Sequence, residues 1–149
     1  MIRIKAVDAQ NILDVCKLKT AQDSVCMAAN GHPACNAISV AQAKYDPKTH
    51  LNAIYNNSVL IGFFMYKRTE NQAKTATLCR FMVDDRFRHR GLEEKALEHI
   101  LRGLKIQGVR KVALIIDGIN ESAKNLYLSF GFHFMGKLDN GKYCYELEM

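Results

Sequence analysis

Apolar and polar residues alternate along much of this chain in the manner of short strands. Residues 2–6 alternate strictly, which predicts a first strand. Two apolar runs at 51–55 and 59–67 are separated by Asn-Asn-Ser, which predicts a hairpin. Residues 75–83 are rich in Thr, Leu, Phe and Val, which are typical of a further strand.

The clearest helical pattern covers residues 92–107, where Leu, Ile and Ala recur on one face at 3.6-residue spacing. Glu93 and Glu94 stand in its first turn, where carboxylates interact favourably with the helix dipole. Gly108 is expected to end the helix. Shorter helices are expected after Asp8, acting as a capping residue, and from Asn36 to before Pro47 in the sequence.

The last third of the chain continues the pattern with a strand, a helix and a hairpin. We expect the strand at 109–116, the helix at 121–130, and the hairpin from 132–137 and 142–147. Three consecutive strands therefore precede a strand–helix–strand unit. This order predicts one domain over residues 1–149, of the α/β (α+β) class, with a mixed sheet rather than a doubly wound parallel one.

Composition and charge exclude several classes of protein. No run of about 18 apolar residues occurs, and the first residues lack the apolar block of a secretory signal, so we expect a cytoplasmic protein without a membrane span. The net charge of +6 favours an anionic partner. The positive residues are spread along the chain, which argues against nucleic acid, apart from one cluster at 86–90 that suits a single phosphorylated cofactor.

Cysteine and histidine spacing argues against a metal site. The five cysteines are odd in number and none is spaced as C-x-x-C, and the five histidines form no H-x-x-x-H pair. We therefore expect neither a disulfide framework nor a bound metal.

Two segments carry candidate chemistry. The first is Arg86-Phe-Arg88-His89-Arg90-Gly91, which lies between a predicted strand and a helix N-terminus, a place where unpaired N–H groups bind anions. A solvated basic turn is the other interpretation. The second segment runs from Asn120 to Tyr127, with Ala123 and Tyr127 on one helix face. In one interpretation the Tyr127 hydroxyl projects into a crevice. In the other, the segment is a helix cap followed by a core Ala and a core Tyr.

Together these two segments resemble the GNAT superfamily of N-acetyltransferases. The family pattern N-x-x-A-x-x-L-Y-x-x-x-G-F is matched by Asn120, Ala123, Leu126, Tyr127, Gly131 and Phe132. The run Arg80-Phe-Met-Val-Asp84 is similar to the R-F-M-I-D of bacterial diamine and spermidine acetyltransferases. The resemblance covers about residues 36–149 and implies a mostly antiparallel sheet of six or seven strands flanked by about four helices.

The resemblance also implies roles for individual residues. Acetyl-CoA is the implied co-substrate, its pantetheine arm bound to the strand at Phe81, Met82 and Val83 and by Asn120. The family loop that holds the pyrophosphate aligns with Arg88, His89, Arg90, Gly91, Leu92 and Glu93, of which Arg88 and Gly91 match the pattern. His89 and Glu93 stand where the family usually has small residues, and the Glu93 carboxylate is expected to repel the cofactor. Tyr127 matches the general acid that protonates the leaving thiolate.

The amine acceptor and the general base are less defined. The subgroup points to a polyamine or diamine, attacking as the neutral amine in a direct transfer within a ternary complex. Carboxylates in plausible places for the base are Asp84, Asp85, Asp117 and Glu146. Because the loop departs from the family pattern, a non-catalytic domain that binds CoA or a protein partner is the alternative. A homodimer is a further expectation.

Overall fold

The computed structural model describes residues 1–19, 36–68, 74–87, 90–116, 121–139 and 141–149. In these residues seven strands form one sheet in the order β1-β2-β3-β4-β5-β7-β6. The strands are β1 (Ile2–Ala6), β2 (Thr49–Asn56), β3 (Val59–Arg68), β4 (Thr75–Val83), β5 (Lys111–Ile116), β6 (His133–Lys137) and β7 (Tyr143–Glu148). Among the described strands, β4 and β5 form the parallel pair, and the other neighbours are antiparallel.

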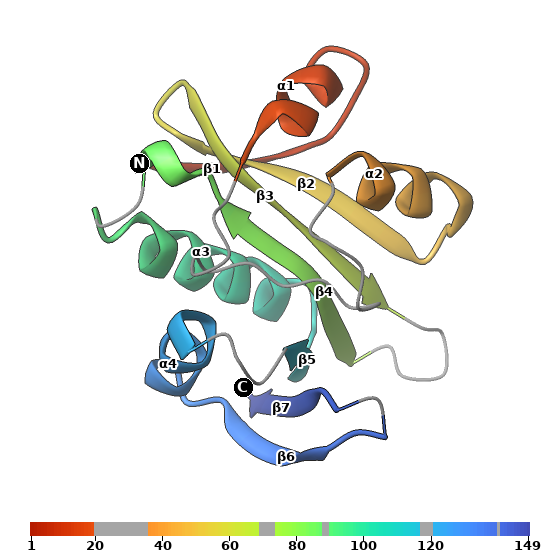
Figure 1. Cartoon of the computed structure of the whole chain (residues 1–149), viewed down its shortest axis with the longest axis vertical. Helices are drawn as coiled ribbons and strands as arrows, with labels where there is room; N and C mark the ends of the chain where they lie inside the picture. Colours follow the sequence, from red (N-terminus) through yellow and green to blue (C-terminus); the bar gives the residue numbers. More distant parts are fainter. Residues whose placement is uncertain (20–35, 69–73, 88–89, 117–120, 140) are drawn as a thin grey trace.

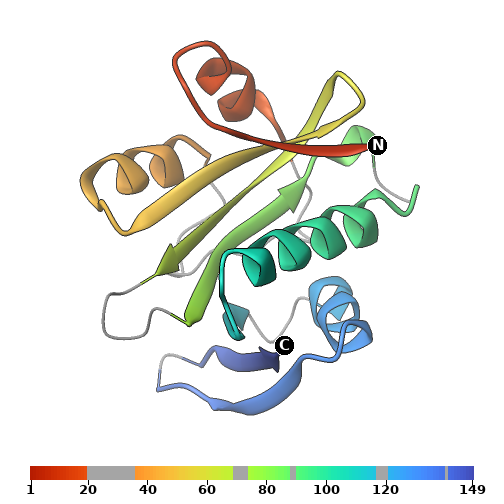
Figure 2. The ribbon, with the colours of Figure 1, turned by 180° about the vertical axis from the view of Figure 1, so that it is seen from behind.

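Helices cover both faces of this sheet (Figure 1 and Figure 2). The short α1 (Ile12–Lys17) and α2 (Asn36–Tyr45) lie on one face, and α3 (Leu92–Ile106) and α4 (Glu121–Ser129) lie on the other. The larger core lies under α3 and α4, while a smaller one joins α1 to Ala53, Phe63 and Met82 of the sheet. The predicted mixed sheet with about four helices is therefore confirmed.

Alternation along the central strands explains the two cores. On β3, Phe63 belongs to the smaller core and Phe64 to the larger one; on β4, Met82 faces α1 whereas Phe81 and Val83 face α3. Because both faces are covered, these strands are apolar nearly throughout, as in the sequence. Arg80 is an exception, since it is only 2% exposed and its guanidinium lies 4.9 Å from the centre of the Phe63 ring.

The predicted start of the first helix needs correction. Asp8 was expected to cap it, but α1 begins at Ile12 with Asn11 as the capping residue. The Asp8 carboxylate accepts hydrogen bonds from the N–H groups of Gln10 and Asn11 instead, which stabilises a turn before the helix. The strand expected from Val109 begins at Lys111, because Val109 still donates to the Leu104 carbonyl at the end of α3.

The remaining boundaries differ from the predictions by one or two residues. Helix α3 ends at Ile106 rather than at residue 107, and β7 is shifted by one residue.

Within the part of the chain that the structure describes, no helix combines the length and apolar character needed to cross a membrane.

Candidate functional site

The two parallel strands separate in the middle of the sheet. β4 and β5 pair from Thr75 and Lys111 as far as Leu78 and Leu114, and their pairing ends there. On its other side β4 continues to pair with β3 as far as Val83. Beyond Leu78, the edge of β4 that faces β5 therefore lies outside the β4–β5 ladder.

A β-bulge lies at the point where the strands separate. Tyr66 of β3 pairs with Leu78 and the preceding Met65 pairs with Arg80, so Cys79 is the extra residue of β4. A bulge bends its strand and increases the local twist, which accounts for the divergence of β4 from β5. Beyond the bulge, Phe81, Met82 and Val83 have buried side chains, and binding of a ligand by their backbone stays a prediction.

The loop after β4 leads directly to the N-terminus of the longest helix. A 3-10 turn spans Asp85–Phe87, and Gly91 is the capping residue of α3 with a left-handed φ of 71°. Glycine adopts this conformation without steric cost. Arg90 is exposed, Leu92 is buried and Glu93 is half-buried, whereas the predicted residues Arg88 and His89 lie outside the described part of the chain.

Phe87 anchors this loop. Its ring packs against the larger core. The guanidinium groups of Arg86 and Arg90 lie 5.2 Å and 6.0 Å from the ring centre. These cation–π contacts hold two positive charges beside the N-terminus of α3, which suits an anionic ligand.

Two carboxylates occupy the first turn of the same helix. Glu93 and Glu94 both stand there, and a Glu94 carboxylate oxygen lies 3.9 Å from where a Cβ on Gly91 would be. Carboxylates at this place interact favourably with the helix dipole. That the Glu93 carboxylate weakens binding of a phosphorylated ligand at the same place stays a prediction.

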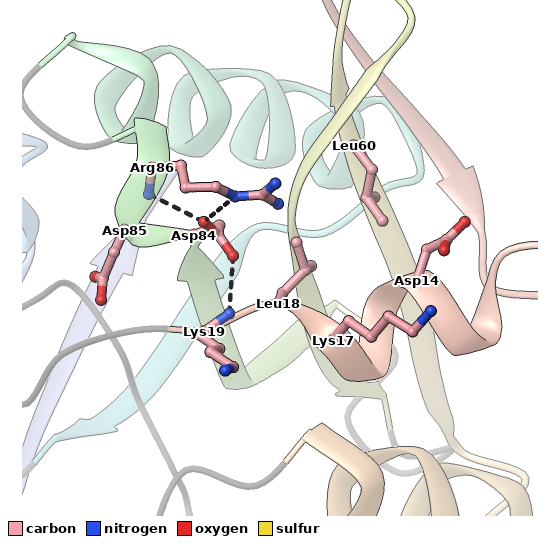
Figure 3. A pocket seen from close by; sticks show the side chains of 8 residues that line it. All are labelled: Asp14, Lys17, Leu18, Lys19, Leu60, Asp84, Asp85 and Arg86. Atoms are coloured by element: carbon pink, nitrogen blue, oxygen red, sulfur yellow. Dashed lines mark hydrogen bonds and ion pairs between the residues drawn. The ribbon is translucent and has the colours of Figure 1, made fainter.

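Asp84 links this loop to α1 (Figure 3). One carboxylate oxygen accepts hydrogen bonds from the Arg86 N–H at 2.9 Å and from its Nε at 2.8 Å, and the other accepts from the Lys19 N–H at 2.8 Å. Burial of Asp84, which is 3% exposed, by itself raises the pKa of the carboxyl. The hydrogen bonds from Arg86 and Lys19 outweigh burial, so the pKa lies below its ordinary value.

A cavity of about 600 Å³ opens beside Asp84 on the face that carries α1. It is lined by Asp14, Lys17, Leu18, Lys19, Leu60, Asp84, Asp85 and Arg86 (Figure 3). Its volume is in the range of small-molecule sites. Three carboxylates and three cationic side chains line it, so its lining carries no formal net charge.

Tyr127 lies on the other side of the sheet, inside the larger core. Its side chain is completely buried on α4, and its ring meets Phe132 edge-on with the centres 5.5 Å apart. Ala123 and Leu126 of the same helix are also buried, so the shared helix face expected from the sequence is confirmed. Asn120 and Asp117, which precede α4, lie outside the described residues, and the roles assigned to Tyr127 and Asn120 stay predictions.

Two of the candidate bases are already paired. Asp84 carries a lowered pKa and is therefore a poor proton acceptor near neutral pH. Glu146 lies 3.8 Å from the Lys111 ammonium. Asp85 is exposed and is one of the residues that line the cavity. Within the described ranges, no three His, Cys, Asp or Glu side chains gather where they could hold a metal ion.

Sequence reasoning missed three residues of this site. The Cys79 bulge and the contribution of the Lys19 backbone depend on strand register and on a contact across 65 residues, for which the sequence carries no local signal. Gly62 had a signal, because a glycine inside an apolar strand often marks a close backbone approach. It lies directly opposite Val83, at the last pair of the β3–β4 ladder.

Comparisons with known proteins agree on one family. The sequence model of the Acetyltransferase (GNAT) family matches residues 17–132. A Bacillus subtilis protein named spermine/spermidine N(1)-acetyltransferase is 33% identical over 96 residues. That match covers 60% of this chain and 63% of the relative, which is less than two thirds of the relative's length.

Solved structures show the same fold over almost the whole chain. An acetyltransferase from Thermus thermophilus superposes with a TM-score of 0.78 at 19% identity, covering 99% of this chain and 97% of that one. The PaiA N-acetyltransferase from Thermoplasma acidophilum, solved in complex with coenzyme A, gives a TM-score of 0.70 at 18% identity, covering 100% and 99%. At these identities the likeness establishes the fold alone.

Proposed function

The chain belongs to the GNAT acetyltransferase family, and on that premise we propose that it transfers an acetyl group from acetyl-CoA to a small primary amine, a polyamine or diamine. The observation that carries the proposal is the separation of β4 from β5 at the Cys79 bulge. It leaves a backbone edge between two helix-covered strands and directs that edge toward the N-terminus of α3. This is the arrangement that an extended, phosphorylated acyl carrier requires.

In this proposal β4 binds the acyl carrier through its backbone. The N–H and C=O groups along Phe81–Val83 would hydrogen-bond the amides of the pantetheine arm, and a strand N–H would polarise the thioester carbonyl. Arg90 and the N–H groups after Gly91 would receive the pyrophosphate. The expected effect of Glu93 is to weaken that interaction.

Tyr127 would supply the proton to the sulfur that leaves. Because its ring is enclosed by the core, the proton would be delivered within the protein rather than from solvent. General acid catalysis of this kind contributes about 10²–10⁴-fold to the rate. Direct attack by the amine needs no covalent enzyme intermediate, which agrees with the raised pKa of the Cys79 thiol, caused mainly by its burial.

The amine would approach from the face that carries α1. Asp14 and Asp85 line the cavity there and could hold the ammonium group at the far end of a diamine. The relative named as a spermine/spermidine acetyltransferase supports the same class of acceptor. Lys17 and Lys19 also line the cavity, which favours a short diamine over a longer, more highly charged polyamine.

The test is an acetylation assay with purified protein, acetyl-CoA and a series of amines that includes putrescine, spermidine and spermine. Release of CoA that depends on the amine, together with an acetylated product identified by mass, is the expected result. Binding of acetyl-CoA without turnover on any primary amine would exclude the proposed activity.

The two carboxylates in the first turn of α3 favour a second candidate, a domain that binds CoA or a protein partner without catalysis. Titration calorimetry with acetyl-CoA and with CoA separates the two functions. Binding of neither ligand, or binding of both without turnover, would favour the non-catalytic domain, whereas binding followed by amine-dependent turnover would favour the enzyme.

A further inference from the structure

The backbone at the end of α1 is held from two directions. On one side Lys19 donates its N–H to Asp84, and the Asp85 N–H returns a hydrogen bond of 2.9 Å to the Lys19 carbonyl. On the other side the buried Asn36 side chain donates to two carbonyls of α1 and its end, Val15 at 2.9 Å and Leu18 at 2.8 Å. The end of α1 is thereby fixed between α2 and the loop that follows β4.

The position of Asp84 calls for a carboxylate rather than an amide. Among the described residues, three groups approach its oxygens and all are N–H donors: the Lys19 backbone, the Arg86 backbone and the Arg86 Nε. An ionised carboxylate offers acceptors at both oxygens, whereas asparagine would turn an NH₂ group toward one of these donors. Either orientation of asparagine would break the contact with Lys19 or those with Arg86.

We infer that Asp84 is a positioning residue that holds the end of α1 and the loop 84–87 together as one unit. A ligand that orders this loop then also orders the wall of the 600 Å³ cavity that α1 provides. In the proposed reaction, acetyl-CoA would bind next to the loop and the amine would bind in that cavity, so Asp84 would link the two substrates. That consequence rests on the proposed function, whereas the connection that Asp84 makes between the end of α1 and the loop 84–87 rests on the geometry.

Asp84 acts through its neighbours and not on the reacting atoms. Its oxygens face N–H groups of the protein. At the start of the loop, the Asp84 N–H donates a hydrogen bond of 2.7 Å to the Ile61 carbonyl of β3. Asp84 therefore joins three segments: its carboxylate binds the end of α1 and the 3-10 turn, and its N–H binds β3. Removal of its charge is expected to loosen the junction and to leave the chemical step intact.

The first experiment measures amide hydrogen exchange in the full-length chain without ligand. Asp84→Asn is compared with the wild type and with Asp46→Asn, which removes a carboxylate of the same charge from a surface ion pair with Lys67. Loss of a charge-assisted hydrogen bond corresponds to at least about tenfold faster exchange of the Lys19 amide in Asp84→Asn. Asp46→Asn is expected to leave that amide unchanged.

Kinetics then separate positioning from catalysis. In Asp84→Asn we expect the KM values for acetyl-CoA and for the amine to rise together, each by about tenfold, with kcat within about threefold of the wild type. Added CoA should slow exchange of the Lys19 amide in the wild type and have little effect on it in Asp84→Asn. If Asp84→Asn does not fold, Arg86→Gln replaces it, since the Arg86 side chain is 70% exposed and its loss removes one of the three donated bonds.

Unchanged exchange at Lys19 in Asp84→Asn, or in Arg86→Gln where that variant is used, would overturn the inference. A collapse of kcat with both KM values unchanged would also overturn it, because that result assigns Asp84 to the chemistry. If the wild type binds no CoA and acetylates no amine, the proposed function fails, and the exchange comparison without ligand still decides the role of Asp84.

Discussion

Gly62 provides the sharpest test of how β3 shapes the candidate site. A methyl group at this position would stand 3.0 Å from the Val83 Cα and 3.1 Å from the Met82 carbonyl carbon, and it would overlap the Met82 carbonyl oxygen. These atoms belong to the backbone, so no rotamer change relieves the contact. Gly62→Ala can be accommodated only if β3 moves away from the end of β4.

The expected cost follows from that geometry. Overpacking in a closely packed core costs about 1–3 kcal/mol, and the backbone contact places Gly62→Ala near the upper value. For a chain of about 150 residues each kcal/mol lowers Tm by about 2–4 °C, so a decrease of about 6–12 °C is expected. The backbone at Met82 and Val83 is also the proposed binding edge for acetyl-CoA, so its KM should rise in the same variant.

Gly103 offers a matched control for the same substitution. It lies inside α3 with no atom within 4 Å of an added Cβ, so Gly103→Ala should gain about 0.5–1 kcal/mol from helix propensity. Thermal and urea unfolding followed by circular dichroism measure both variants. If Gly62→Ala is as stable as the wild type while Gly103→Ala is stabilised, the packing of Gly62 against Met82 and Val83 is wrong.

Three further results are expected. Tyr127→Phe should lower kcat by about 10²-fold or more with little change in CoA affinity, and unchanged turnover would remove the hydroxyl from the mechanism. Glu93→Gln should tighten CoA binding by about fivefold in calorimetry, the equivalent of ~1 kcal/mol. Glu98→Gln, further along α3, is the control and should leave the affinity unchanged. Equal CoA affinities of Glu93→Gln and the wild type would refute the repulsion argument. The folded pKa of Asp84 lies below the ordinary value of 3.8, so the contribution of its carboxylate to stability is present above pH 3.8 and is lost as pH falls through the folded pKa. The Tm difference between the wild type and Asp84→Asn should therefore shrink on acidification. A constant difference would contradict the direction of the pKa shift.

Local chemistry determined the elements and their order. The apolar face of α3 follows from side-chain spacing within fifteen residues, and the strand at 75–83 follows from its β-branched and aromatic content, so both were predicted with boundaries within a residue of those observed. The motif from Asn120 to Phe132 likewise identified the family, because a match of spacing and residue type needs no coordinates. The start of α1 was misplaced because Asp8 stabilises a turn and a helix end with the same kind of hydrogen bond.

Only the tertiary structure decided how these elements form a site. The bulge at Cys79 is a property of register between β3 and β4, and a one-residue difference in pairing leaves no trace in the composition of either strand. Likewise, the sequence marked Asp84 as a carboxylate near the loop, but its partner Lys19 contributes a backbone N–H that every non-proline residue carries. The sequence by itself determined which residues form helices and strands, since those preferences act over a few residues; which backbone atoms meet across the sheet was decided by packing of distant segments.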